Sequence, residues 1–307
     1  MLILKILDIS IYLCDIITCE RRCDMKVRKS MFSGSWYPGS ASACEQEIKG
    51  FLKEYPAETI DKKSLIGGIV PHAGWYFSGS IACNVIHCLG GQTPPDVFVI
   101  FGMHLHSSSP AYIMVEGAWE TPFGAIEIET ELSRELAQKF TFQIETADNF
   151  TQDNTIELQL PFIKYFFKDA KIVPIGAPPT KRSLEIGQAV ADMSKQLGLQ
   201  VNIIGSTDLT HYGPNYGFVS HGRGSSAVNW ARNENDRRVI DAMLAMDPET
   251  VIKEAMTNQN ACCSGAAATA IAAAKHLGAE KAQTIAYATS YDKSPGDSFV
   301  GYVGIVF

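Results

Sequence analysis

Short apolar segments alternate with segments of helical spacing along this chain, and this alternation limits its fold more than any other feature. Residues 65–70 and 96–101 are near-continuous apolar runs, which is typical of strands that are buried on both faces. Segments of about 10–15 residues with helical spacing, such as 183–197, lie between runs of this kind. The alternation therefore predicts an α/β sheet covered by helices on both faces. The expected strands are 65–70, 96–101, 111–116, 125–129, 171–175, 201–204, 284–289 and 299–306, and the expected helices are 42–54, 78–88, 131–139, 155–167, 183–197, 236–246, 248–256 and 265–277.

The first 24 residues differ from everything that follows them. They are apolar, but Lys5, Asp8 and Asp15 fall inside the apolar stretch, whereas a signal peptide keeps its charges ahead of it. We interpret residues 1–24 as a leader outside the fold or a misplaced start, with Met25 as the true start. An N-terminal element of the fold and a targeting signal are the less favoured alternatives. The sequence beyond it carries no linker or internal repeat, so we expect residues 25–307 to form a single α/β domain.

Composition excludes several classes of protein. Apolar residues make up 46% and charged residues 19%, which is too apolar and too weakly charged for a disordered chain. Lys and Arg number 26 against 33 Asp and Glu, and this net charge of −7 argues against a nucleic-acid partner. No apolar run reaches the ~18–20 residues of a membrane span. Eight cysteines are too few for a disulfide scaffold, and we expect a reduced, cytoplasmic protein.

Histidines directly follow three of the predicted buried strands. His72 comes after 65–70, His104 and His106 come after 96–101, and His211 comes after 201–204. In open α/β sheets the ligand crevice lies beyond the carboxyl ends of the strands, so these imidazoles would converge if the strands are neighbours. Converging histidines are the commonest way to hold a transition metal. The alternative is that each histidine only caps its strand or satisfies a local polar contact.

Two thiols and two carboxylates extend this candidate site. Cys262 and Cys263 precede the predicted helix 265–277, and a thiol at a helix N-terminus has a lowered pKa. Neighbouring cysteines cannot easily both bind one metal, and small buried hydrophobic residues are the alternative interpretation. Asp208 precedes a histidine by three residues and is placed to accept a hydrogen bond from a ligand imidazole. Glu157, near the start of helix 155–167, is a candidate further carboxylate of the site.

Taken in order, several segments of the chain resemble the Memo family, called AmmeMemoRadiSam system protein B in bacteria and archaea. The resemblance spans residues 32–307, and the ordered set of motifs is specific although no single motif is unique. The motifs are Gly34-Ser35-Trp36-Tyr37-Pro38-Gly39, Pro71-His72-Ala73-Gly74 with Tyr76 and Ser78-Gly79, strand 96–101 with Gly102 and its following histidine, Thr155-Ile156-Glu157-Leu158-Gln159-Leu160-Pro161-Phe162, Ser206-Thr207-Asp208-Leu209-Thr210-His211-Tyr212-Gly213, and Gly301-Tyr302.

The family is similar in fold to the class III extradiol (LigB-type) non-haem iron dioxygenases. The resemblance therefore implies a three-layer α/β/α sandwich around a central mixed, mostly parallel sheet. It also implies a metal site of three histidines and one cysteine, with iron as the favoured metal and copper or zinc as alternatives. Carried over to this sequence, the ligands are His72, His104 or His106, His211, and Cys262 or Cys263.

Two of these ligand positions have two candidates each. The family motif has its histidine at the position between His104 and His106, and we favour His104. Alignment of a later glycine of the family motif selects Cys262 over Cys263. A histidine that the family often carries before its Ile-Glu is replaced here by Asp153-Asn154-Thr155, which argues against conventional dioxygenase catalysis.

Three functions follow as hypotheses. The first is a metal-dependent redox enzyme, dioxygenase-like, with a small-molecule substrate and with Asp208 and Glu157 as its catalytic residues. The second is a non-catalytic metal-binding or partner-binding protein that acts with a radical-SAM protein. The third is an adaptor for phosphorylated peptides, as the resemblance implies for the eukaryotic relative. An adaptor needs arginines beside the crevice, and nothing in the sequence places Arg223, Arg232, Arg237 or Arg238 there.

Overall fold

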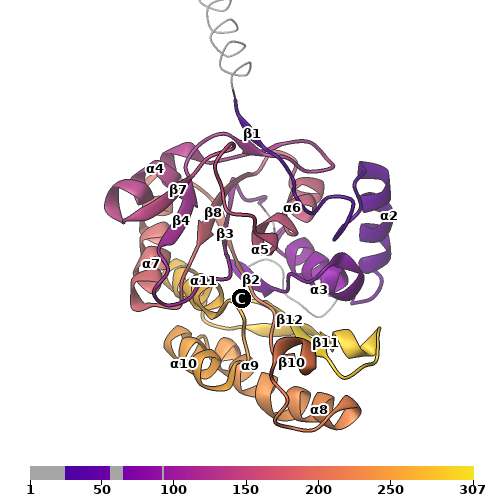
Figure 1. Ribbon diagram of the computed structural model, residues 1–307. Helices are drawn as coiled ribbons and strands as arrows, with labels where there is room; N and C mark the ends of the chain where they lie inside the picture. Colours follow the sequence, from indigo (N-terminus) through magenta and orange to yellow (C-terminus); the bar gives the residue numbers. More distant parts are fainter. Residues whose placement is uncertain (1–24, 56–64, 92) are drawn as a thin grey trace, which may run out of the picture.

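The computed structural model describes residues 25–55, 65–91 and 93–307, so the prediction for residues 1–24 lies outside the described residues. Within these ranges, nine strands form one mixed sheet in the order β10-β12-β2-β9-β3-β8-β4-β7, with β11 paired to β12 (Figure 1). The strands are β2 Gly67–Val70, β3 Val97–Gly102, β4 Ala111–Met114, β7 Phe142–Glu145, β8 Lys171–Gly176, β9 Val201–Ser206, β10 His211–Tyr212, β11 Gln283–Thr289 and β12 Phe299–Val306.

Four parallel strands, β2, β9, β3 and β8, form the centre of this sheet. Phe101 lies opposite Gly205, so β3 and β9 end at the same edge of the sheet. Side chains along β3 alternate between two cores: Val99 and Phe101 pack in one, and Phe98 and Ile100 in the other. Burial on both faces is the reason that the strand has a continuous apolar sequence.

Helices cover both faces of the sheet (Figure 1). Helices α7 and α11 pack in one core, and α2, α3 and α6 pack in the other. Helices α7 and α11 lie very close, because a Cβ at Gly187 would sit 2.5 Å from the Thr269 carbonyl oxygen. This arrangement confirms the predicted α/β/α sandwich. The helices are α2 Ala41–Phe51, α3 Trp75–Cys88, α4 Thr130–Lys139, α5 Asn154–Glu157, α6 Leu160–Phe166, α7 Lys181–Gln196, α8 Gly224–Trp230, α9 Asp236–Leu244, α10 Pro248–Asn258 and α11 Ser264–Leu277. None of the described helices has the length and apolarity needed to cross a membrane.

The single helix predicted over residues 155–167 is wrong, because the structure divides it into α5 and α6. Pro161 lies in the first turn of α6, where its missing N–H costs no hydrogen bond, so a new helix begins there. Between the two helices, Gln159 donates a hydrogen bond from Nε2 to the carbonyl oxygen of Pro71 at 3.0 Å. The interruption thereby ties this segment to the end of β2.

Three strands of two residues each form a second, small sheet in the order β1-β5-β6. They are Val27–Arg28, Ala118–Trp119 and Ile126–Glu127. The fully buried Arg28 fixes this sheet against the rest of the fold. Its guanidinium donates to Glu145 at 2.7 Å and lies 3.5 Å from the ring centroid of Trp119. A buried ion pair with a stacked aromatic ring holds the start of the described chain in place.

Candidate metal centre

The carboxyl ends of three neighbouring parallel strands carry the candidate site. His72 follows β2, His104 follows β3, and Asp208 follows β9. Met103 has a φ of 71°, a left-handed conformation that is uncommon for a residue with a side chain, and its N–H donates to Thr155 Oγ1 at 2.7 Å. This turn redirects the chain immediately before His104. The crevice expected from the sequence pattern lies where the strands end.

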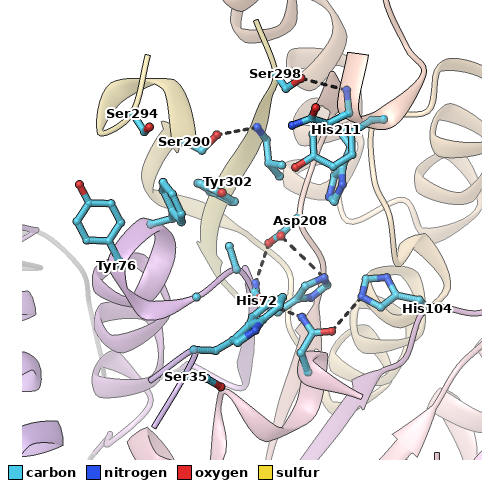
Figure 2. Close-up of a pocket in the computed structure, with 18 residues that line it drawn as sticks. Ser35, His72, Tyr76, His104, Asp208, His211, Ser290, Ser294, Ser298 and Tyr302 are labelled. Atoms are coloured by element: carbon cyan, nitrogen blue, oxygen red, sulfur yellow. Dashed lines mark hydrogen bonds and ion pairs between the residues drawn. The ribbon is translucent and has the colours of Figure 1, made fainter. Parts of the chain in front are cut away.

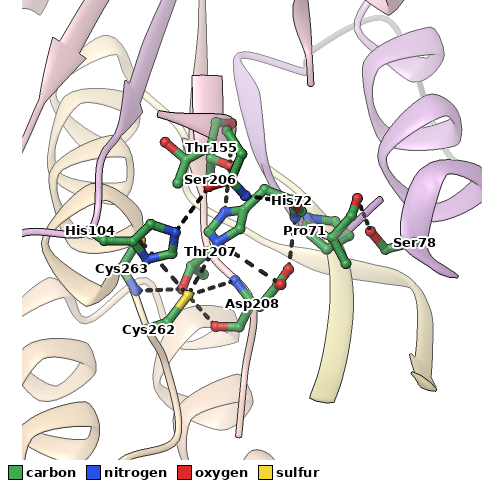
Figure 3. A network of polar contacts seen from close by, with 12 residues as sticks. Pro71, His72, Ser78, His104, Thr155, Ser206, Thr207, Asp208, Cys262 and Cys263 are labelled. Atoms are coloured by element: carbon green, nitrogen blue, oxygen red, sulfur yellow. Dashed lines mark hydrogen bonds and ion pairs between the residues drawn. The ribbon is translucent and has the colours of Figure 1, made fainter. Parts of the chain in front are cut away.

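Two imidazoles and two thiols come together in this crevice. His72, His104, Cys262 and Cys263 each offer one donor atom, and these atoms all lie within 4.8 Å of one another (Figure 3). His72 Nε2 is 3.3 Å from Cys262 Sγ, and His104 Nδ1 is 3.3 Å from Cys263 Sγ. The two sulfur atoms are 3.8 Å apart. We call these four residues the His/Cys cluster.

Neighbouring polar groups determine which ring nitrogen of His72 faces the His/Cys cluster. Ser206 Oγ donates its hydrogen to the carbonyl oxygen of Thr155 at 2.8 Å, so it accepts from His72 Nδ1 at 3.0 Å. With Nδ1 protonated, the lone pair of a neutral ring lies on Nε2, which faces Cys262.

Asn154 has the corresponding role for His104. Its Nδ2 donates to the carbonyl oxygen of His72 at 2.9 Å, and its Oδ1 lies 3.3 Å from His104 Nε2. Protonation of Nε2 leaves His104 Nδ1 as the atom that faces Cys263. In the neutral form of each ring, these neighbours therefore leave the unprotonated nitrogen facing the sulfur atoms.

The charges of the site favour a thiolate on Cys262. Burial lowers the pKa of His72, but the charges of Asp208 and Cys262 outweigh it and raise the pKa to about 9. Burial raises the pKa of Cys262, but a hydrogen bond from Cys263 and the charge of His72 bring it well below its usual range. Burial and the neighbouring thiolate raise the pKa of Cys263. One thiolate in contact with one imidazolium results, and the thiolate is the form that binds metal.

Asp208 contacts His72 at two points. It accepts a hydrogen bond from the backbone N–H of His72 at 2.7 Å, and its second oxygen lies 3.9 Å from Nε2 of the ring. Burial raises the pKa of Asp208. The sequence predicts that this carboxylate accepts a hydrogen bond from a ligand imidazole. In the structure its hydrogen bond comes from the backbone N–H of His72, and the imidazole of His72 lies beside it.

The other predicted site residues lie outside the His/Cys cluster. His211 is on β10, and its ring meets that of Tyr216 edge-on with 4.9 Å between the ring centroids. Its buried Nε2 has no partner within hydrogen-bond distance among the described residues, although His211 is near enough to contribute to the lowered pKa of Cys262. His106 contacts Ser108 Oγ at 2.9 Å and is exposed. Of the two candidates after β3, the structure therefore brings His104 to the cluster.

Glu157, predicted as a further carboxylate of the site, instead contacts the segment around Met31. Its carboxylate is buried and accepts hydrogen bonds from the backbone N–H groups of Met31 and Phe32, both at 2.8 Å, and from the hydroxyl of Tyr37 at 3.0 Å. It belongs neither to the His/Cys cluster nor to the residues that line the adjoining pocket. These contacts anchor the segment that joins β1 to α2.

A pocket of about 550 Å³ opens beside the cluster (Figure 2). His72, His104, Asp208 and His211 line it together with aromatic and hydroxyl side chains. The remaining lining residues are Ser35, Trp36, Ala73, Gly74, Tyr76, Phe77, Asn154, Asn215, Tyr216, Ser290, Ser294, Ser298, Val300 and Tyr302. The pocket is large enough for a small molecule to reach the imidazoles.

A buried polar network that the sequence analysis missed supports the segments leading into the site. Asp236 accepts from the backbone N–H of Thr210 at 3.0 Å and from the hydroxyl of Tyr287 at 2.7 Å. Asn235 donates to Thr210 Oγ1 at 2.9 Å, and Asn260 donates to the Asn235 carbonyl oxygen at 2.9 Å. Burial raises the pKa of Asp236 to about 6. The network thereby joins Thr210, which precedes His211, to Asn260, which lies two residues before Cys262.

The profile of the family described as "Memo-like protein" matches residues 28–306 of this chain. The MEMO1 family protein of Pyrococcus furiosus is 33% identical over 291 residues, which cover 91% of this chain and 98% of that protein. The MEMO1 family protein of Thermococcus onnurineus is 34% identical over 292 residues, covering 92% and 99%. That of Methanococcoides burtonii is 31% identical over 284 residues, covering 91% and 99%.

Among solved structures, the chain is similar to an uncharacterized protein from Escherichia coli K12. The TM-score is 0.47 and the sequence identity 11%, over 73% of this chain and 91% of that chain. The profile match and the relatives above 30% identity confirm the predicted resemblance, and the chain belongs to the Memo family.

Proposed function

We propose that this protein binds a redox-active transition-metal ion at its His/Cys cluster and acts on a small molecule in the adjoining pocket. The observation that carries the proposal is the approach of four donor atoms, from three separate parts of the chain, to within 4.8 Å of one another. Imidazole and thiolate donors together suit iron, copper and zinc. We favour iron, as the family resemblance implies, and bound iron would supply one-electron chemistry.

His72, His104 and Cys262 are the proposed ligands. Each imidazole has one nitrogen engaged by a polar neighbour and the other directed at the sulfur atoms, which is the usual arrangement of a metal-binding histidine. His211 supports the proposal in another way, because a buried ring nitrogen without a partner costs free energy unless something binds it. An ion at the edge of the cluster is a partner that fits this nitrogen.

Asp208 acts as a positioning residue in this proposal. Its carboxylate holds the backbone of His72 and lies beside the imidazole, so it fixes the ring and favours its protonated form in the absence of metal. Glu157 has no part in the proposed chemistry, because its carboxylate is fully engaged by the segment at Met31 and Phe32.

The lining of the pocket argues against a phosphorylated ligand. Trp36, Tyr76 and Tyr216 supply aromatic walls, and none of the described lining residues is an arginine or a lysine. Arg232, one of the arginines considered for an adaptor, pairs instead with Asp292 at 2.9 Å. The hypothesis of a phosphopeptide adaptor therefore has no supporting contact here. The radical-SAM partner that the resemblance implies stays a prediction.

A closed structural zinc site is the second candidate function. The observation that favours it is the presence of Cys263 as a fourth donor, since two cysteines and two histidines are a common set for structural zinc. A closed site leaves no position for a substrate. A protein that holds zinc through all four residues, and unfolds when the zinc is removed, would support this alternative.

Metal analysis of protein purified without added metal tests the proposal. We expect wild-type protein to carry close to one equivalent of metal, and His72→Ala and Cys262→Ser to lose it while keeping wild-type circular dichroism. His106→Ala is the matched control, because this histidine is outside the cluster and should leave metal content unchanged. Retention of metal by both cluster variants would contradict the proposed ligands.

Oxygen uptake then separates the two candidates. Protein loaded anaerobically with iron(II) is exposed to oxygen in the presence of thiols and catechols as probes. Uptake that is lost in His72→Ala supports the redox enzyme. Two results together would favour the structural zinc site. The iron-loaded protein would consume no oxygen, and zinc added to the metal-free protein would restore its stability against unfolding.

A further inference from the structure

We infer that Cys262 and Cys263 form a reversible disulfide with each other, and that its formation removes both sulfur donors from the cluster. The disulfide is inferred from the two cysteines alone, whereas its effect on a metal rests on the proposed function. The sulfur atoms already face each other at 3.8 Å (Figure 3). The pair is thus a site of oxidative modification in addition to its part in the cluster.

The backbone at the pair is not part of a helix. Helix α11 begins only at Ser264, and Cys263 has a φ of −124° and a ψ of 53°. The backbone N–H of Cys262 donates to the carbonyl oxygen of Asp208 at 3.1 Å, and that of Cys263 donates to Thr207 Oγ1 at 3.1 Å. The turn is therefore tied to the end of β9, and it presents both thiols on the same side.

Cys262 lines a second pocket, which gives a small oxidant a route to this residue. This pocket of about 350 Å³ is lined by Cys262 and His211, with Leu209, Tyr216, Ala255, Gln259 and Ala261. Cys263 is only 3% exposed and lines neither this pocket nor the larger one. A small oxidant that enters by this route meets Cys262 first, and Cys263 is the resolving thiol behind it.

Hydrogen peroxide is the oxidant class that balances the reaction. The Cys262 thiolate attacks one peroxide oxygen, the O–O bond breaks, and the leaving hydroxide takes the proton held on the neighbouring His72 to become water, which gives a sulfenic acid on Cys262. The Cys263 sulfur then attacks the Cys262 sulfur, the S–O bond breaks, and a second water leaves with the Cys263 proton. The two thiols lose two electrons in total, and the peroxide is reduced to two molecules of water.

The resulting disulfide is readily reduced. Cα atoms of adjacent residues are about 3.8 Å apart, below the ~4.4–6.8 Å that relaxed disulfides span. Closing the ring between neighbours therefore strains the bond, and strained disulfides have more oxidising potentials and react readily with thiols. The pair is suited to a reversible change rather than to a permanent cross-link.

Oxidation changes what the cluster offers to a metal. His72 and His104 keep their nitrogens, but their 3.3 Å sulfur neighbours become disulfide sulfurs without a thiolate charge. Two neutral imidazoles bind a transition metal far more weakly than two imidazoles with a thiolate. Peroxide therefore releases the metal, and a thiol reductant restores the site.

Peptide mapping of the full chain tests the disulfide without any metal. Reduced, metal-free protein is treated with hydrogen peroxide in slight excess, alkylated, and cleaved with trypsin. Cleavage after Lys253 and Lys275 gives peptide 254–275, whose only cysteines are Cys262 and Cys263. We expect this peptide to be unalkylated and lighter by two hydrogen atoms, and a thiol reductant to restore both alkylation sites.

Cys263→Ser is the matched variant, since it keeps Cys262 and its imidazole but removes the resolving thiol. We expect its Cys262 to stop at the sulfenic acid, which a carbon-nucleophile reagent traps. Two alkylated cysteines in peroxide-treated wild type would overturn the inference. So would oxidation of Cys262 to the sulfinic acid beside a free Cys263.

Titration of reduced and oxidised protein with iron(II) tests the effect on the metal. We expect the oxidised protein to bind iron(II) more than about 100-fold more weakly than the reduced protein. Loss of a residue that only hydrogen-bonds to a metal ligand already lowers metal affinity about 10–100-fold, and oxidation removes a ligand itself. If the disulfide forms but the reduced protein binds no metal, the proposed function fails and the disulfide stands. If metal binds equally to both forms, the inferred release is wrong.

Discussion

Replacement of Glu157 by alanine separates a structural role from a catalytic one. The buried carboxylate is the acceptor for the N–H groups of Met31 and Phe32 and for the hydroxyl of Tyr37, at 2.8–3.0 Å. Glu157→Ala leaves these three donors without an acceptor. Each unsatisfied buried donor costs about 1–3 kcal/mol, and water can reach part of this segment because Met31 is 46% exposed. We take the lower part of that range for each donor and expect a loss of roughly 3–5 kcal/mol.

Urea unfolding monitored by circular dichroism measures this loss, and a metal titration of the folded variant measures the site. We expect Glu157→Ala to lower the free energy of unfolding while leaving metal affinity near that of wild type. Glu157→Gln keeps one acceptor oxygen and should lose about half as much. Glu127→Ala, at an exposed glutamate on β6, should stay within about 0.5 kcal/mol of wild type. Unchanged stability together with abolished metal binding would refute this reasoning and return Glu157 to the site.

Three further predictions concern buried groups. Arg28→Met leaves Glu145 as an uncompensated buried charge and should cost about 3–5 kcal/mol in urea unfolding, most of which a second change, Glu145→Met, should restore. Burial raises the pKa of Asp236 from 3.8 to about 6, so the folded state binds the carboxyl proton more tightly than the unfolded state does. The protonated carboxyl group therefore stabilises the fold fully below pH 3.8, and this contribution is lost as the pH rises through about 6. Asp236→Asn should abolish this pH-dependent loss, which amounts to roughly 3 kcal/mol of the free energy of unfolding. Urea unfolding of wild type and variant below pH 3.8 and above pH 6 measures the difference. Ser206→Ala removes the partner of His72 Nδ1 and should weaken metal binding about 10–100-fold in a chelator competition, whereas unchanged affinity would contradict the orienting role.

The central architecture could be predicted because each buried strand has its own sequence signature. Continuous apolar runs such as residues 96–101 reflect burial on both faces, and this property is local. His72 and His104 could be located from the same logic, since both directly follow strands that run parallel. The choice of His104 over His106 came from the family motif and agrees with the residue that the structure brings to the cluster.

The parts that could not be predicted depend on contacts between distant segments. Adjacent cysteines were not expected to approach one site together, but the turn before α11 directs both Cys262 and Cys263 to it. Asp236 opens a helix whose sequence is typical of a surface helix, and only tertiary packing buries its carboxylate. Strands β1 and β5 have two residues each, too few for any periodicity to be detected.

The neighbours of β2 in the sheet have a consequence for the order of biosynthesis. Strand β2, which ends two residues before His72, lies between β9 and β12, at residues 201–206 and 299–306 (Figure 1). A nascent chain that has passed β2 thus carries a strand without either of its final partners until far more of the protein has been made. Such long-range pairing folds slowly and leaves strand edges open in the meantime. We therefore expect β2 to find both of its final partners only after β12 has been made, and the His72 side of the site to assemble among the last steps of folding.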